Sequence, residues 1–269
     1  FLDVLARDYG AGMQILDFAP NPLGAIAAIN QWVSDHTAGK IPKLLSPHDV
    51  TPDTRLVLVN AVYLKAKWAL PFPARDTFPA PFHAPGATAQ VPTMHQTAQF
   101  DYLRGAGYQV AELAYRRSRL AFDVLLPDPG GLAALLAQSA RRGPLALLNG
   151  LEPRRVALSL PKLQLSTQAE LAPALQALGL KLAFQPGEAN LSGITGPPGQ
   201  LFIQAVVHAV YIRVDEAGTE AAAATGVSTG VTAVAPQPAI DFNIDRPFLF
   251  VLRDTASGAI LFAGVVSQP

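Results

Sequence analysis

A run of twenty residues without a single charge, residues 221–240, constrains the fold of this chain more than any other segment. It follows the motif Glu216-Ala217-Gly218-Thr219-Glu220 and consists mostly of alanine, glycine, threonine and valine. A core helix is not expected here, because such helices bury large apolar side chains on one face. On composition alone, the segment is a flexible surface loop or an alanine-rich helical turn.

The spacing of small residues adds a third possibility, a strand that inserts into an existing sheet. Alternate residues of a strand face the same side. One alternate set is uniformly small and uncharged: Thr219, Ala221, Ala223 and Thr225. Glu220 falls in the other set, Gly218 gives a flexible hinge, and no proline removes a backbone donor before Pro236. These features favour an inserting strand over a passive loop.

The rest of the chain alternates between helical and strand-like patterns, with strands concentrated toward the end. Helices are expected at residues 1–9, 21–39, 131–148 and 171–178, where Asn21-Pro22 and Gly179 supply start and stop signals. Strands are expected at residues 13–18, 56–68, 109–113, 120–126, 155–165, 201–214, 240–242, 248–253 and 259–266, with short strands and turns over 71–96. The near-continuous apolar run of 56–68 predicts a strand covered on both faces. The mixture predicts an α+β fold with several sheets.

Charge and composition exclude several classes of function. Twenty basic residues balance twenty acidic ones, which argues against a nucleic-acid partner. The absence of cysteine excludes disulfides and thiolate metal sites, and no run of 18 apolar residues predicts a membrane span. The chain opens inside a helical pattern without a signal peptide, so we expect it to be cut from a longer one. Its alanine- and proline-rich composition points to a bacterial source.

Motifs for catalysis or metal binding are absent from the sequence. There is no G-x-S-x-G and no H-E-x-x-H, and the five histidines lack metal-ligand spacing. We therefore predict no catalytic residue, no metal site and no cofactor. A hydrolase would instead need a histidine–carboxylate site formed by residues that are distant in the sequence and close in the fold. The cations Arg116, Arg117 and Arg119 are expected to lie at a solvated strand end.

Several motifs resemble the serpin family of serine protease inhibitors. One stretch is similar to the hinge of the family's reactive loop: Glu216, Gly218, Thr219, Glu220, Ala221, Ala222, Ala223, Ala224 and Thr225. Residues 60–68 resemble the third strand of the family's main sheet, and residues 207–210 resemble the fifth. Residues 245–250 and 258–266 resemble the carboxyl-terminal signature, so the similarity covers essentially the whole chain.

The resemblance implies an α+β serpin fold with a large central mixed sheet, two smaller sheets and surrounding helices. It implies a single domain over residues 1–269, truncated at its amino-terminal end so that the amino-terminal helices are missing. Residues 216–240 would be the reactive-centre loop. Asn60 and His208 would form the shutter, and Trp68 would belong to the region where the strands open.

By resemblance, the protein is a peptidase inhibitor and not an enzyme. A serine peptidase would cleave the loop and form an acyl-enzyme, and the freed loop would insert between the strands that carry Asn60 and His208. The scissile bond is expected at Thr232–Ala233, with bonds 231–232 and 234–235 also open. Each candidate follows a small or medium uncharged residue, which favours an elastase-like or subtilisin-like target over a trypsin-like one.

The alternatives are a non-inhibitory serpin that acts as a carrier or chaperone, an inactive fragment, and a hydrolase. Non-inserting serpins often carry bulky, charged or proline residues in the hinge, and the absence of such residues from the small alternate set favours inhibition. The predicted partner is a target serine peptidase in a covalent complex. The chain is otherwise expected to be a monomer, with polymerisation through loop insertion left open, in an extracellular or cell-surface location.

Overall fold

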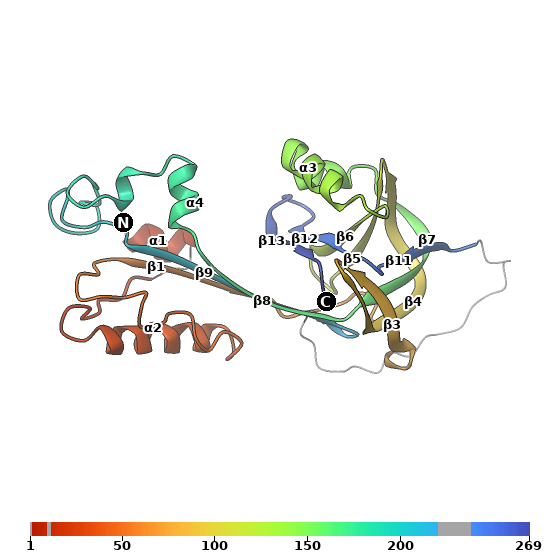
Figure 1. The fold of residues 1–269 in the computed structure, drawn as a ribbon, viewed down its shortest axis with the longest axis horizontal. Coiled ribbons are helices and arrows are strands. Elements are labelled where there is room, and N and C mark those ends of the chain that lie inside the picture. The colour runs from red at the N-terminus through yellow and green to blue at the C-terminus, as the bar shows by residue number, and fades with distance from the viewer. Residues whose placement is uncertain (1, 10–11, 220–237) are drawn as a thin grey trace. The chain divides into compact units, whose positions relative to one another are not determined.

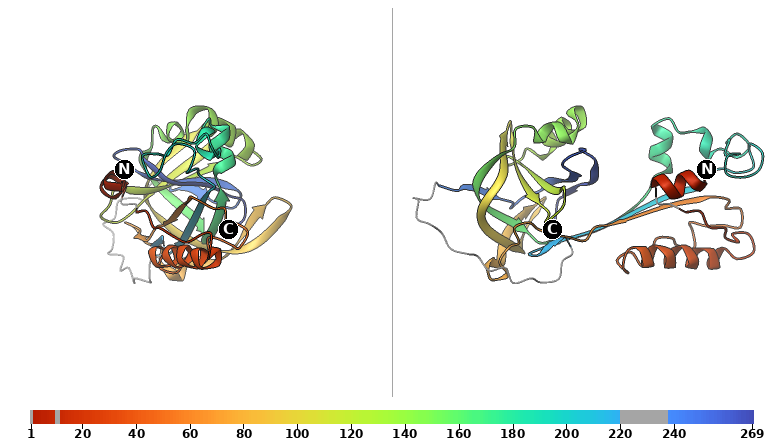
Figure 2. Two further views of the ribbon diagram at one scale, coloured as in Figure 1. Left: turned by 90° about the vertical axis from the view of Figure 1, so that its left-hand side faces the viewer. Right: turned by 180° about the vertical axis from the view of Figure 1, so that it is seen from behind.

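The structure is a computed structural model that describes residues 2–9, 12–219 and 238–269. The chain forms two compact units, shown in Figures 1 and 2. The first comprises Phe1–Tyr63 and Leu165–Tyr211, and the second comprises Leu64–Gln164 and Ile212–Pro269. Strands β8 (Leu163–Glu170) and β9 (Ala205–Asp215) contribute residues to both. Each unit is described by itself.

The first unit is built on three strands, because β8 also pairs with β9. β1 (Val57–Tyr63) pairs with the first part of β9, from Val57 opposite Ala205 to Tyr63 opposite Tyr211. The helices of this unit are α1 (Leu2–Tyr9), α2 (Pro22–His36), α4 (Ala172–Ala177) and the short 3-10 helix η3 (Leu182–Phe184). α2 lies along one side of β1 and β9 in both figures.

Helix α2 begins where the sequence predicts and covers one face of the strands. Asn21 Oδ1 accepts a hydrogen bond from the Gly24 backbone N–H at 2.9 Å, and Pro22 occupies the first turn. The apolar side of the helix joins a core that includes Ile26, Ile29, Val33, Val207, Ala209 and Tyr211. The alternation of β9 thus places its odd-numbered residues toward α2.

The second unit contains an eight-stranded sheet. Its strand order is β11-β7-β4-β5-β6-β12-β13, with β3 paired to β4. These strands are β3 (Thr77–Ala84), β4 (Ala87–Gly105), β5 (Tyr108–Ala114), β6 (Leu120–Pro127), β7 (Glu152–Pro161), β11 (Ile240–Asn243), β12 (Phe248–Asp254) and β13 (Ile260–Val266). The remaining elements are β2 (Ala66–Lys67), η1 (Ala74–Asp76), α3 (Leu132–Arg142), η2 (Pro144–Leu148) and β10 (Gly218–Thr219).

The α+β prediction is confirmed. Residues 71–96 form two longer strands rather than several short ones, because β3 lies at an edge where its prolines cost no ladder bond. α3 and η2 pack on the sheet through a buried core of Tyr108, Val110, Leu125, Leu135, Leu147, Leu148, Leu249 and Val251. Among the described helices, none is long and apolar enough to cross a membrane.

Two strand predictions are wrong. Residues 13–18 form no strand, and Ile15 is 94% exposed, so the alternating pattern there has no partner strand. The expected strand 56–68 is divided between β1 and β2. It is also not covered on both faces, because Leu58 and Asn60 alternate with the residues that face α2 and are exposed. Leu58 is 41% exposed.

Candidate functional site

The predicted hinge begins as a two-residue strand in the second unit. In β10, Gly218 lies between Lys67 of β2 and Asp215 of β9, and Thr219 lies between Ala66 and Val214. Both pairings are antiparallel. Gly218 has a φ of 152°, and a Cβ atom there would lie 2.1 Å from the Ala66 carbonyl oxygen. Only glycine fits this position without moving the backbone of β2.

Trp68 holds the turn that leads into β10. Its backbone N–H donates to the Ala217 carbonyl at 3.0 Å, and its indole Nε1–H donates to the Asp215 carbonyl at 2.9 Å. The ring is 2% exposed and stacks on Tyr115 with the centroids 4.6 Å apart. The structure therefore places Trp68 against Asp215 and Ala217, directly before the predicted hinge strand.

Thr219 is the first residue of the small alternate set, and it is fully buried. Its hydroxyl forms a hydrogen bond with the hydroxyl of Tyr115. Burial raises the pKa of Tyr115, an effect that the bond to Thr219 only partly opposes, so the phenol stays neutral. Sequence reasoning missed Tyr115, because a tyrosine at the end of an ordinary strand carries no pattern that links it to the hinge.

Glu216 is held by an ion pair that the sequence also did not indicate. Lys162 Nζ donates to the two carboxylate oxygens at 2.8 and 3.1 Å, and the Glu216 carbonyl accepts from the Phe72 N–H at 2.9 Å. Burial alone would raise the pKa of the Glu216 carboxyl, but the bonds from Lys162 help to lower it below its usual value. Lys162 follows the end of β7, and its distance of more than fifty residues from Glu216 hides the pairing.

Asn60 and His208 meet in the first unit. They face each other across the parallel β1–β9 ladder, and His208 Nδ1 lies 2.9 Å from Asn60 Oδ1. Since the amide oxygen can only accept, the proton of this bond sits on the histidine nitrogen. This bond joins the two strands that the resemblance expects to part.

The other predicted site residues lie outside the described residues. They are Glu220, Ala221, Ala222, Ala223, Ala224 and Thr225 of the hinge, and Thr232 and Ala233 of the scissile bond. Within the described ranges, no group of three or more His, Cys, Asp or Glu residues is placed to hold a metal ion. The contacts around β10 are structural in character: they fix the positions of Gly218 and Thr219, the last described residues before the uncharged segment.

Comparisons with known proteins assign a family to this arrangement. The family model described as Serpin (serine protease inhibitor) matches residues 1–269. A serpin-like protein of Thermococcus kodakarensis is 36% identical over 271 residues, covering 100% of this chain and 62% of that protein. The leukocyte elastase inhibitor of Xenopus laevis is 34% identical over 277 residues, covering 100% of this chain and 72% of that protein.

Solved structures agree with the family match. Serpin48 of the insect Tenebrio molitor superposes with a TM-score of 0.88 at 33% identity, over 100% of this chain and 71% of that one. Thyroxine-binding globulin in complex with thyroxine superposes with a TM-score of 0.87 at 28% identity, over 100% and 70%. The chain therefore spans between three fifths and three quarters of the length of these proteins.

Proposed function

The chain belongs to the serpin family, and from this premise we propose that it is a suicide-substrate inhibitor of a serine peptidase. The family is one of peptidase inhibitors rather than catalysts. The peptidase serine attacks the carbonyl carbon of Thr232, an ester forms with the serine oxygen, and the amide bond breaks as Ala233 leaves with a proton on its new amino group. Insertion of the freed loop then traps the ester before water hydrolyses it.

The pairing register of the strands is the observation that carries this proposal. β1 and β9 are paired directly with each other, which leaves no strand between them. Lys67 and Asp215 lie on either side of Gly218. The sequence separation between these two residues equals that between Val57 and Ala205, which pair directly with each other. A strand that continues β10 between β1 and β9 therefore needs no register shift in either neighbour.

The same register indicates what insertion would displace. Continued residue by residue from Thr219, it brings Thr225 opposite both Asn60 and His208. The hydrogen bond between these two side chains would be broken, and a small hydroxyl residue would take its place between them. Insertion from Thr219 to Thr232 involves about 14 residues and moves the attached peptidase by about 45 Å.

The residues before the candidate bonds favour an elastase-like or subtilisin-like target. Thr232 is our first choice, and bonds 231–232 and 234–235 are the neighbours to test. A specificity pocket with a buried carboxylate would leave its charge unpaired against any of these residues. The name of the Xenopus laevis relative, a leukocyte elastase inhibitor, is consistent with this preference.

The proposal is tested by mixing the protein with elastase, subtilisin and trypsin. We expect a covalent complex that survives denaturing electrophoresis with elastase or subtilisin, and a large rise in the thermal midpoint after loop cleavage. Thr225→Pro should abolish both, because a proline removes a backbone donor that the inserted strand needs, whereas Thr225→Ser should preserve both. A complex with trypsin alone would overturn the target assignment, and the absence of any midpoint change on cleavage would overturn insertion.

A carrier function is the second candidate, and the structural similarity to thyroxine-binding globulin favours it. The same experiment distinguishes the two functions, because a carrier that cannot insert its loop is cleaved without forming a covalent complex. We favour inhibition because the sequence from Gly218 to Thr225 has no proline and no bulky residue. The partner is then the trapped peptidase, the free protein is a monomer, and an extracellular or cell-surface location gives access to such targets.

A further inference from the structure

Asp123 is a carboxylate in the middle of an otherwise apolar strand. The sequence of β6 is LAFDVLLP, and alternation places Asp123 on the same face as Leu125, which shares a core with Leu135 of α3. The side chain of Asp123 is 0% exposed. Its Oδ2 accepts a hydrogen bond from Arg253 Nε at 2.8 Å, whereas its Oδ1 has no hydrogen-bond partner among the described residues. Because buried polar atoms are almost always paired, this oxygen needs an explanation.

A second carboxylate lies directly opposite Asp123 on the neighbouring strand. Glu112 of β5 is its cross-strand partner, so both side chains lie on the same face, with their Cβ atoms about 5 Å apart. Arg253 of β12 bonds to both, since its Nη2 lies 2.5 Å from Glu112 Oε2. The side chains of Arg253 and Glu112 are 14% and 13% exposed. One guanidinium, largely out of contact with water, therefore faces two carboxylates, which leaves one surplus negative charge.

Other charged groups do not neutralise this surplus. The remaining charged residues of the adjacent elements β5, β12, α3 and η2, and those on the same face of β4 and β7, are Asp254, Arg141, Arg142, Asp101 and Arg155. Asp254 forms an ion pair with Arg119, and the two arginines of α3 lie in its exposed last turn. Asp101 and Arg155 are two and three strands away from β6.

A bound proton would remove the surplus charge. Burial raises the pKa of Asp123 to about 7, while Arg253 opposes this shift and Glu112 adds to it. Below that pH the carboxyl of Asp123 is protonated, and its hydroxyl can donate a hydrogen bond to the carboxylate of Glu112. Above that pH the proton leaves, and two like charges face each other across the β5–β6 ladder, which is a destabilising arrangement.

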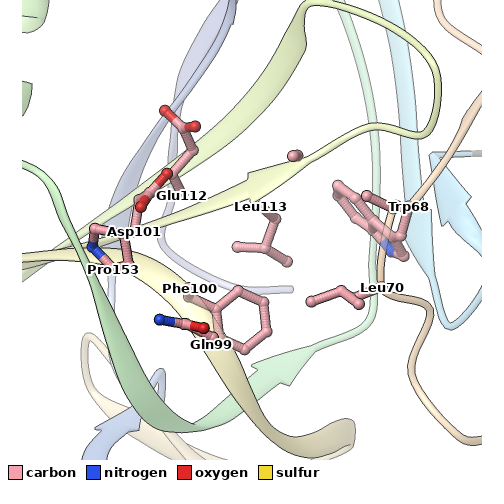
Figure 3. Close-up of a pocket in the computed structure, with 10 residues that line it drawn as sticks. Trp68, Leu70, Gln99, Phe100, Asp101, Glu112, Leu113 and Pro153 are labelled. Atoms are coloured by element: carbon pink, nitrogen blue, oxygen red, sulfur yellow. The ribbon is translucent and has the colours of Figure 1, made fainter. Parts of the chain in front are cut away.

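The other face of the same two strands carries residues that pack against Trp68. The next row of the β5–β6 ladder is Leu113 opposite Phe122, and alternation directs both away from the carboxylates. The ring of Phe122 packs edge-on to Trp68, with the centroids 6.0 Å apart. Figure 3 shows Leu113 between Glu112 and Trp68. Because a packed interior transmits strain, a change in the carboxylate row should reach Trp68, which holds the turn before β10.

We propose that Asp123, Glu112 and Arg253 form a proton-binding site that makes the hold on the hinge strand β10 depend on pH. With the proton bound, β5 and β6 lie close together and Trp68 is firmly packed. Without it, repulsion between the carboxylates loosens the two strands and the packing of Trp68 and Tyr115 on the other face. The hinge strand is then held less tightly above neutral pH than below it.

Trp68 reports on this change directly. The second tryptophan of the chain, Trp32, belongs to the other unit, so in a Trp32→Phe variant of the full chain the emission comes from Trp68 alone. Quenching by acrylamide, which is uncharged, measures how well solvent reaches the ring. We expect the quenching to increase from about pH 5 to about pH 9, with a midpoint at about 7. Asp123→Asn should abolish this increase, whereas Asp241→Asn, which removes an exposed carboxylate of β11, should preserve it.

Glu112→Gln tests the carboxylate pair rather than Asp123 alone. It removes the like charge that helps to raise the pKa of Asp123, so the midpoint of the quenching curve should fall by about one pH unit. Quenching that does not change with pH, an increase that persists in Asp123→Asn, or an unchanged midpoint in Glu112→Gln would each overturn the proposal.

The consequence for peptidase trapping rests on the proposed function. A hinge that is held less tightly should insert sooner, so the trapping rate of the wild type divided by that of Asp123→Asn should rise as pH passes through about 7. Division by the rate of the variant cancels the pH dependence of the peptidase itself. A constant or falling ratio would overturn the link to insertion. The absence of any covalent complex would overturn the proposed function instead, and the acrylamide measurement would still decide on the proton-binding site.

Discussion

The ion pair between Lys162 and Glu216 makes a quantitative prediction about the hinge. The two side chains are 33% and 21% exposed, and the ammonium reaches both carboxylate oxygens. At 2.8 Å and an effective dielectric constant of about 20, the Coulomb attraction is on the order of 6 kcal/mol. Desolvation offsets most of it, which leaves about 1–2 kcal/mol for a charge-assisted, partly buried pair.

Glu216→Gln should therefore lower the thermal midpoint by about 2–8 °C in differential scanning calorimetry at pH 7 and low salt. Glu216→Lys should cost more, since it places two ammonium groups together. The lowered pKa of Glu216 sets the pH dependence: the stabilisation is present above the unfolded value of 4.5 and is lost as pH falls through the folded pKa. The deficit of Glu216→Gln should accordingly shrink in acid.

The charge reversal provides the control. Lys162→Glu alone should be destabilising, and the double variant that exchanges the two residues should recover at least half of the summed loss, because it restores an ion pair at the same place. If the single and double variants all have the thermal midpoint of the wild type, the ion pair does not stabilise the position of Glu216, and the reasoning is refuted.

Three further predictions concern other contacts of the two units. Tyr115→Phe should cost about 1–3 kcal/mol of unfolding free energy in urea, because it leaves the buried Thr219 hydroxyl unpaired, and adding Thr219→Val should recover part of the loss. Burial raises the pKa of Asp123 to about 7, while Arg253 opposes this shift and Glu112 adds to it. The protonated Asp123 therefore stabilises the folded protein fully below pH 3.8, and this stabilisation is lost as pH rises toward 7. Relative to Asp123→Asn, the wild type should thus lose about 2–3 kcal/mol between pH 5 and pH 8 in the same assay, and parallel profiles would contradict this. Asn60→Ala should cost the uncleaved protein about 0.5–1 kcal/mol, since its bond to His208 is exposed; no measurable change would mean that the bond does not hold the strands.

Local signals predicted the ends of elements well. Asn21 and Pro22 start α2, and Gly179 follows the end of α4 with a φ of 107°. Each of these positions depends on the conformation or capping of one or two residues, which the sequence states directly. The late strands β11, β12 and β13 could also be predicted from the sequence, because turn residues separate their apolar runs.

Contacts between residues that are far apart in the sequence could not be predicted from such local signals. Alternation at residues 13–18 is a necessary condition for a strand, but a strand also needs a neighbour, and none pairs with this segment in the described residues. The partners Lys162 and Tyr115 of the hinge are set by which strands the topology brings together. The resemblance supplied Asn60, His208 and Trp68, whereas no pattern in the sequence supplied the residues that hold Glu216 and Thr219.

The hinge and the shutter should therefore respond differently to loop insertion. The pairs that Gly218 and Thr219 make with β2 and β9 have the register that an inserted strand would keep, so insertion need not break them. The bond between Asn60 and His208, in contrast, occupies the row that Thr225 would take. It follows that Tyr115→Phe should lower the thermal midpoint of the uncleaved and cleaved proteins by similar amounts, because its contact to Thr219 persists in both. Asn60→Ala should lower only that of the uncleaved protein, so an equal effect of Asn60→Ala on both forms would place the opening somewhere other than between β1 and β9.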